Sequence, residues 1–131
     1  MGYCSKCVDK YSGYFYLVFR VLIGVLFFMH GWMKFSGSNP AAFGSLFWFA
    51  GAIEVVAGVL LVLGLFSRLV ATVTAIEMIV AWFVAHVSRG WNPLANGGEA
   101  AVLFLAAFLV VIVYGNGKLS LEPKLWKKEL F

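Results

Sequence analysis

The sequence has few charged residues. Of its 131 residues only 12% are charged, whereas about a quarter are charged in a typical soluble domain. Hydrophobic residues make up 63% instead, which leaves too few polar side chains to cover the surface of a soluble fold. We therefore expect an integral membrane protein, and the length leaves no room for a separate soluble catalytic domain beside its membrane helices.

Cysteine is also scarce: the chain has two, Cys4 and Cys7, which form a C-x-x-C near the N-terminus. Two thiols are too few for an iron–sulfur cluster or a closed zinc site within one chain, and no dinucleotide-binding glycine fingerprint follows a strand. We expect no cofactor held by this chain's own motifs. The thiol pair has three interpretations, which the sequence leaves open: reduced thiols without a role, redox or shared-metal chemistry, and attachment of a lipid.

Long apolar segments predict four helices, because one crossing of a bilayer takes about 20 helical residues. Turn-forming or polar residues separate them at 35–40, 64–68 and 88–98. The predicted helices cover residues 14–34, 43–65, 68–87 and 99–115. The expected fold is an all-α membrane protein, an up-down antiparallel bundle of four transmembrane helices within residues 14–118. A polar leader, 1–13, precedes this bundle and a basic tail, 119–131, follows it.

The basic residues predict the orientation of the bundle. One side would hold Lys6, Lys10, Arg68, Lys118, Lys124, Lys127 and Lys128. The other side would hold only Lys34 and Arg89, so the positive-inside rule places both termini in the cytoplasm. The net charge of +4 then reflects membrane topology. We expect a multi-pass protein of the cell membrane whose partner is the lipid bilayer, with no nucleic-acid partner.

Ionisable side chains within a bilayer are costly unless they are paired or hydrated, so each one is a candidate functional position. At about 1.5 Å of rise per residue, Glu54 lies near the level of His30 and Lys34. We expect Glu54 to face the bundle interior and to pair with one of them. Arg20 and Glu77 lie closer to the cytoplasmic side, where we expect a buried ion pair.

Polar side chains from all four predicted helices gather in the outer half of the bundle. The candidate pocket there consists of His30, Lys34, Glu54, His86 and Glu99. One interpretation is an ion pair that only fixes helix packing, and another is a pocket that binds a polar ligand head or relays protons. A third is a metal site of His30, Glu54, His86 and Glu99. The Glu-x-x-His pair of such bundle sites is absent, and we expect no metal.

Several motifs occur in order along the chain: Arg20 with Gly24, H-G-x-x-K-F from His30, I-E-V-V-A-G-V-L-L-V-L-G-L-F-S-R from Ile53, and G-N-G-K-L-S-L-E from Gly115. Together they resemble the DoxX family of small four-helix membrane proteins. This resemblance implies a membrane subunit of a quinone-linked oxidoreductase system. It also implies that His30, Lys34, Glu54 and Glu99 are the polar positions to test.

Three functions remain as hypotheses. In the first, the outer pocket binds a quinone head, Glu54 or His30 exchanges its proton, and a redox partner subunit carries the electrons. In the second, the chain is a non-enzymatic scaffold or assembly protein whose buried charges set packing. In the third, it is a small proton-coupled transporter, for which four helices would require a homo-oligomer. The sequence assigns no catalytic residue.

Overall fold

The computed structural model describes residues 3–127, with the backbone alone for residues 3–5 and Cys7. Its helices are α1 (Tyr3–Ser36), α2 (Leu46–Leu63), α3 (Ser67–Ala81), the π-helical turn η1 (Trp82–His86), the 3-10 turn η2 (Val87–Arg89), α4 (Pro93–Asn96), α5 (Glu99–Tyr114) and α6 (Glu122–Trp126). The described residues contain no strand, which confirms the all-α expectation. Cys4 and Cys7 lie outside the described side chains, so their chemistry stays a prediction.

Three helical stretches of the described residues are long and apolar enough to cross a bilayer: Val8–Ser36, Leu46–Leu63 and Ser67–Arg89. Helix α5 is apolar but has 16 residues. At about 1.5 Å per residue it extends about 24 Å, which is shorter than a bilayer core of roughly 30 Å. The chain is a multi-pass membrane protein.

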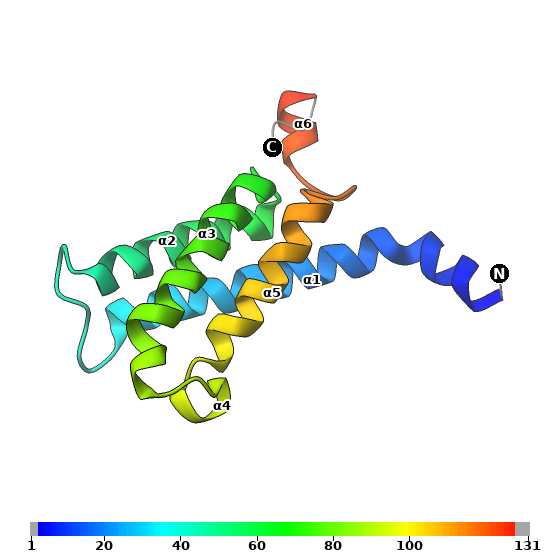
Figure 1. The fold of residues 1–131 in the computed structure, drawn as a ribbon. Helices are drawn as coiled ribbons and strands as arrows, with labels where there is room; N and C mark the ends of the chain where they lie inside the picture. The colour runs from blue at the N-terminus through cyan, green and yellow to red at the C-terminus, as the bar shows by residue number, and fades with distance from the viewer. Residues whose placement is uncertain (1–2, 128–131) are drawn as a thin grey trace.

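The long helices α1, α2, α3 and α5 alternate in direction (Figure 1). Helix α1 packs most closely on α2, and α3 packs most closely on α5. The N-terminal part of α1 extends past the other helices (Figure 1). The bundle therefore consists of two antiparallel helix pairs, with a helical extension at one end.

The first helix begins at Tyr3 rather than at the predicted residue 14. The polar side chains of residues 3–13 lower the hydropathy of this stretch, but they do not exclude it from a helix. The stretch contains no proline, and Gly13 is its single glycine, so no strong helix breaker interrupts it. Residues 3–13 of the predicted leader therefore belong to α1.

Glycines allow α1 and α2 to approach closely. A Cβ atom added at Gly24 would lie 2.9 Å from the carbonyl oxygen of Gly58, and one added at Gly58 would lie 2.6 Å from that of Gly24. Nearer the other end of the pair, a Cβ at Gly31 would lie 2.7 Å from the carbonyl oxygen of Gly51. Helices in a bilayer associate mainly through such close packing, so these glycines hold α1 against α2.

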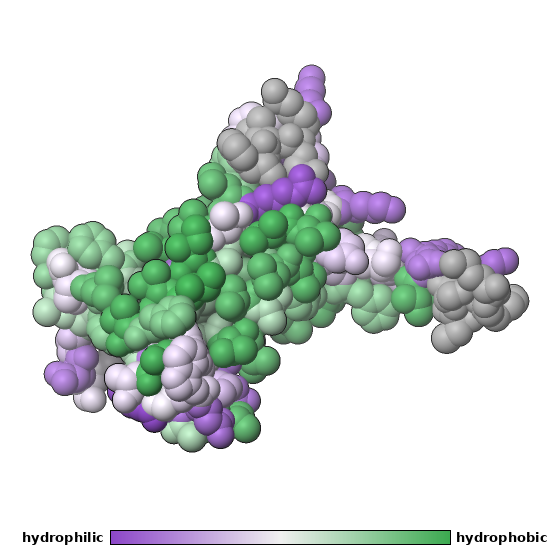
Figure 2. Space-filling model, in the orientation of Figure 1, coloured by the Kyte–Doolittle hydropathy of each residue, from purple (hydrophilic) through white to green (hydrophobic). Residues whose placement is uncertain are grey.

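The outer surface is mostly apolar, and the buried core is small. Figure 2 shows hydrophobic residues over the middle of the bundle and hydrophilic ones near α4 and near the chain ends. Val113 is 71% exposed and Met33 is 67% exposed. In the core, the rings of Phe27 and Phe108 are fully buried with their centroids 4.8 Å apart. This inverted pattern fits a protein whose solvent is lipid.

Candidate functional site

A cavity of about 620 Å³ opens between α2 and α3. Its other lining residues come from α1, η1, η2, the loop before α5 and α5 itself. Large apolar side chains that line the cavity are also exposed at the surface, among them Phe47, Ile53, Ile76 and Val80. Because these exposed side chains face hydrocarbon in a bilayer, the cavity can receive an apolar molecule from the lipid.

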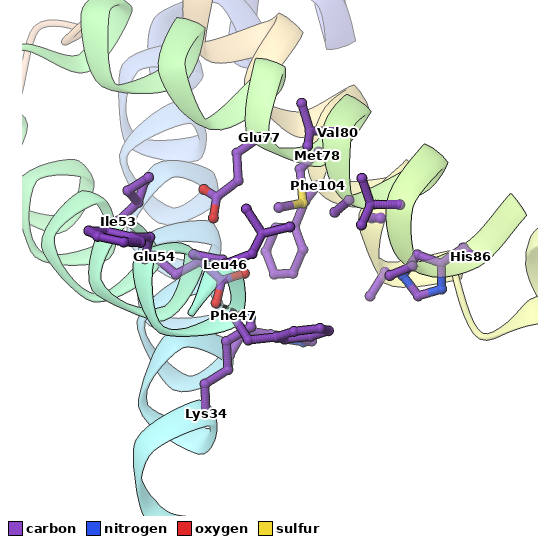
Figure 3. A pocket seen from close by; sticks show the side chains of 18 of the residues that line it. Lys34, Leu46, Phe47, Ile53, Glu54, Glu77, Met78, Val80, His86 and Phe104 are labelled. Carbon is purple, nitrogen blue, oxygen red and sulfur yellow. Dashed lines mark hydrogen bonds and ion pairs between the residues drawn. The ribbon is translucent and has the colours of Figure 1, made fainter. Parts of the chain in front are cut away.

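An ion pair between Lys34 and Glu54 lies in the wall of this cavity (Figure 3). The Nζ atom of Lys34 donates a hydrogen bond to Oε2 of Glu54. The Glu54 side chain is 5% exposed and that of Lys34 is 22% exposed. Glu54 shares a helix face with Gly51, which packs against α1. Of the two partners that the sequence offered for Glu54, the structure selects Lys34.

Glu77 is a second carboxylate in the lining of the cavity. Both of its carboxylate oxygens are buried, and neither has a hydrogen-bond partner among the described residues. In Figure 3 the carboxylate points toward Glu54, and its electrostatic neighbours are Glu54 and Lys34. The cavity therefore brings together two carboxylates and one lysine, a grouping that the sequence did not predict.

The predicted ion pair between Arg20 and Glu77 does not form. The guanidinium of Arg20 instead donates to the carbonyl oxygens of Asn116 and Leu119, the latter at 2.9 Å. Both carbonyls lie after the end of α5, where the backbone is not helical and must find other donors. The sequence prediction rested on the similar depths of Arg20 and Glu77 in the membrane. Depth alone does not show that these two carbonyl oxygens compete with Glu77 for the guanidinium of Arg20.

Arg20 belongs to a buried polar cluster at the end of the bundle opposite the cavity. Asn116 accepts a hydrogen bond at Oδ1 from the Ser67 backbone at 3.0 Å and donates to Oε2 of Glu122 at 2.7 Å. The same Glu122 oxygen accepts from the Phe66 backbone at 2.6 Å. Asn116 and Glu122 are fully buried. These bonds fasten the α2–α3 turn to the segment after α5.

Sequence reasoning missed the roles of Asn116 and Glu122. Both stand in the motif G-N-G-K-L-S-L-E, which served only to carry the family resemblance. Polar residues spaced between glycines directly after an apolar helix are the signal that could have indicated a folded cap. Their observed role is structural, because their hydrogen bonds hold the α2–α3 turn and neither residue lines the cavity.

His30 lies between two hollows of the molecule. It lines the main cavity and also a groove of about 580 Å³ between α1 and α5. Its ring meets that of Phe104 edge to face, with the ring centroids 5.2 Å apart, and Phe104 lines both hollows as well. The groove is otherwise lined by apolar residues, so the described polar groups favour the main cavity as the site.

His86 reaches the cavity from η1, the π-helical turn. Its Nδ1 lies 3.4 Å from the carbonyl oxygen of Asn96. The buried side chain of Asn96 donates to the Gly90 carbonyl and accepts from the Gly98 backbone, both at 2.7 Å. This network fixes the loop before α5. Because π-helical turns occur frequently at functional sites, η1 adds to the case for this end of the bundle.

Glu99 does not join the other predicted pocket residues. It is exposed at the start of α5 and does not line the cavity, whereas Arg89, which the sequence assigned to an outer loop, does line it. Among the described residues, no three His, Cys, Asp or Glu side chains are placed to hold a metal ion. The alternative metal site that included Glu99 is therefore not assembled.

Comparisons with known proteins place the chain among relatives. The model of the DoxX family matches residues 15–87. An uncharacterized protein of Haemophilus influenzae (strain ATCC 51907 / DSM 11121 / KW20 / Rd) is 37% identical, over 92% of this chain and 98% of the relative. A Bacillus subtilis (strain 168) protein named "Putative oxidoreductase CatD" is 30% identical, over 85% of this chain and 87% of that protein. No solved structure gives a significant match.

Proposed function

The chain belongs to the DoxX family of membrane proteins, and from this premise we propose that it crosses the bilayer four times and binds the head of a quinone in the cavity between α2 and α3. In this proposal it serves as the membrane subunit of an oxidoreductase. The family supports the membrane location, while the ligand is argued from the chemistry of the cavity.

The distribution of charge supports four crossings with both termini in the cytoplasm. The backbone of Leu121 donates to the carbonyl oxygen of Leu63 at 3.2 Å, so the α2–α3 turn and the C-terminal segment lie at the same end. The N-terminal part of α1 extends outward from this same end of the bundle (Figure 1). Three segments at this end carry exposed basic side chains: the N-terminal part of α1, the α2–α3 turn and the C-terminal segment. These residues are Lys6, Lys10, Arg68, Lys118, Lys124 and Lys127. The positive-inside rule makes this end cytoplasmic, and the cavity then lies in the outer half.

The cavity is the observation that carries the proposal. Ligand pockets for small molecules have volumes of about 300–1,000 Å³ and combine apolar walls with a few polar groups; this one has about 620 Å³. A quinone has a flat ring with carbonyl oxygens and an apolar tail. The exposed apolar lining suits the tail, and the ammonium of Lys34 can donate further hydrogen bonds beyond the one to Glu54. Glu54 can accept the proton of a quinol.

Electrons would come from a partner subunit. Two cysteines are too few for a cluster within one chain, so this chain would bind and position the quinone while the partner carries the redox centre. The name of the Bacillus subtilis relative, which describes an oxidoreductase, supports this context. The same division of labour assigns the bilayer and a redox subunit as the two partners of the chain.

Filling the cavity should weaken quinone binding. Ala50 lines the cavity on α2, and in Ala50→Phe the added ring would occupy the space of the quinone head. We expect the apparent Kd of a short-chain ubiquinone analogue to rise about tenfold or more, which corresponds to at least about 1.4 kcal/mol. The measurement is quenching of intrinsic tryptophan fluorescence by the quinone, with purified protein in lipid nanodiscs.

The matched control is Val56→Phe. Val56 lies on the same helix, is 58% exposed and does not line the cavity, so the added ring should leave quinone affinity unchanged. Equal affinities of the wild type, Ala50→Phe and Val56→Phe would show that the quinone partitions into lipid and not into the cavity. That result would reject the proposed site and leave the scaffold function as the better hypothesis.

A further inference from the structure

We infer that Glu77 is a neutral carboxylic acid in the ligand-free protein and that its proton is the hydrogen-bond donor for a carbonyl oxygen of the bound quinone. The identity of the ligand rests on the proposed function. The protonation of Glu77 does not, because it follows from the surroundings of the carboxyl group.

Burial without a hydrogen-bond partner favours the neutral form of Glu77. Both carboxylate oxygens of Glu77 are buried and unpartnered among the described residues. An ionised carboxylate in an apolar environment costs several kcal/mol unless a cation or hydrogen-bond donors compensate it, and such groups take up a proton instead. In a bilayer the surrounding hydrocarbon strengthens this argument, since bulk water cannot approach through the lipid.

The neighbouring charges also favour the neutral form of Glu77. The other ionisable side chains that line the cavity are His30 and Lys34 of α1, Glu54 of α2, His86 of η1 and Arg89 of η2. Helix α5 contributes no ionisable side chain to the lining. The electrostatic neighbours of Glu77 are Glu54, which repels a second negative charge, and Lys34. The ammonium of Lys34 is already bound to Glu54, and within the part of the chain that the structure describes Glu77 accepts no hydrogen bond from a cation.

A protonated carboxyl group changes what the cavity can bind. A quinone ring offers carbonyl oxygens as acceptors and no proton of its own, so it needs donors from the protein. Lys34 on α1 and Glu77 on α3 supply donors from two different walls of the cavity (Figure 3). An ionised Glu77 would instead repel a carbonyl oxygen. The arrangement therefore favours the oxidised quinone as the ligand of the resting protein.

Infrared difference spectroscopy tests this inference directly. We expect wild-type protein in lipid nanodiscs at neutral pH to show the carbonyl-stretch band of a protonated carboxylic acid, which shifts in D₂O. The band should be lost in Glu77→Gln and kept in Glu99→Gln, which changes an exposed glutamate outside the cavity. Adding a short-chain ubiquinone analogue should move the band to lower frequency, as hydrogen bonding to the quinone strengthens.

Each outcome decides a different part of the inference. Glu77→Gln replaces one neutral group by another of the same shape, so it should fold and unfold like the wild type. The absence of any band that depends on Glu77 would overturn the inference. The quinone could bind in the cavity, as shown by weaker binding to Ala50→Phe, without shifting the Glu77 band. That result would overturn the role of Glu77 as the hydrogen-bond donor to the quinone. A band without any quinone binding would reject the proposed function but uphold the protonation of Glu77.

Discussion

Replacing Lys34 with methionine is expected to destabilise the protein by about 3 kcal/mol or more, because removal of one partner leaves a buried charge uncompensated. Glu54 is only 4% exposed. A Cβ atom added at Gly31 would lie 2.8 Å from the Cβ of Glu54, so the backbone of α1 keeps this side chain from moving away. The free energy of unfolding of Lys34→Met, measured in mixed detergent micelles, checks the prediction.

A double variant separates the ion pair from the packing of its side chains. In Lys34→Met with Glu54→Met, no charge is left unpaired, and replacement of a buried ion pair by apolar groups is often nearly neutral. We expect the double variant to recover most of the lost stability. Arg68→Met removes an exposed cation of α3 and should change stability by less than about 0.5 kcal/mol. Equal destabilisation of the single and double variants would contradict the role given to the pair.

The second large effect is expected at the opposite end of the bundle, where Arg20→Met should destabilise the protein by about 3 kcal/mol. Arg20 is 1% exposed and donates to the carbonyl oxygens of Asn116 and Leu119. Hydrogen bonds to charged groups contribute about 1.5–3 kcal/mol each, and both carbonyls would lose their donor. Hydrogen exchange should accelerate at the backbone amides of Leu121 and Glu122, which bond to the α2–α3 turn.

Arg20→Lys and Lys118→Met are the matched controls for this prediction. Lysine keeps the charge but lacks the planar fork that reaches two acceptors at once, so Arg20→Lys should recover only part of the stability. Lys118 is an exposed cation of the same C-terminal segment, and Lys118→Met should leave exchange at Leu121 unchanged. Unaltered exchange and unfolding in Arg20→Met would show that the segment is held by other contacts.

The sequence predicted where the apolar helices lie better than where helices end. The predicted helix at residues 99–115 matches α5, Glu99–Tyr114, because glycines stand on both sides of it. At α1 the prediction failed at the N-terminus, because a loss of hydrophobicity marks the edge of the membrane and not the end of a helix. The π-helical turn Trp82–His86 had no signal in the periodicity, since it differs from an α-helix by one residue in a turn.

Helical depth predicted that Glu54 would pair with Lys34 or His30, but it did not predict the surroundings of Glu77. Depth follows from rise per residue, whereas a contact also depends on which helices are neighbours and on competing acceptors. Helix α1 packs most closely on α2, so Glu54 of α2 pairs with Lys34 of α1. Arg20 donates hydrogen bonds to the carbonyl oxygens after α5, and Glu77 lines the cavity without a bond to Arg20. No pattern of residues along the chain predicted these contacts of Arg20 or the position of Glu77.

Photoaffinity labelling with an azidoquinone tests most directly whether the cavity between α2 and α3 takes a quinone from the bilayer. Labelled protein from nanodiscs is digested, and mass spectrometry locates the modified residues. If the quinone binds in this cavity, the label should lie on cavity residues of α2 and α3, such as Phe47 and Ile76. Both an excess of unlabelled quinone and the Ala50→Phe substitution should suppress this labelling. Label confined to the α1–α5 groove, or spread over lipid-facing side chains without competition, would contradict it.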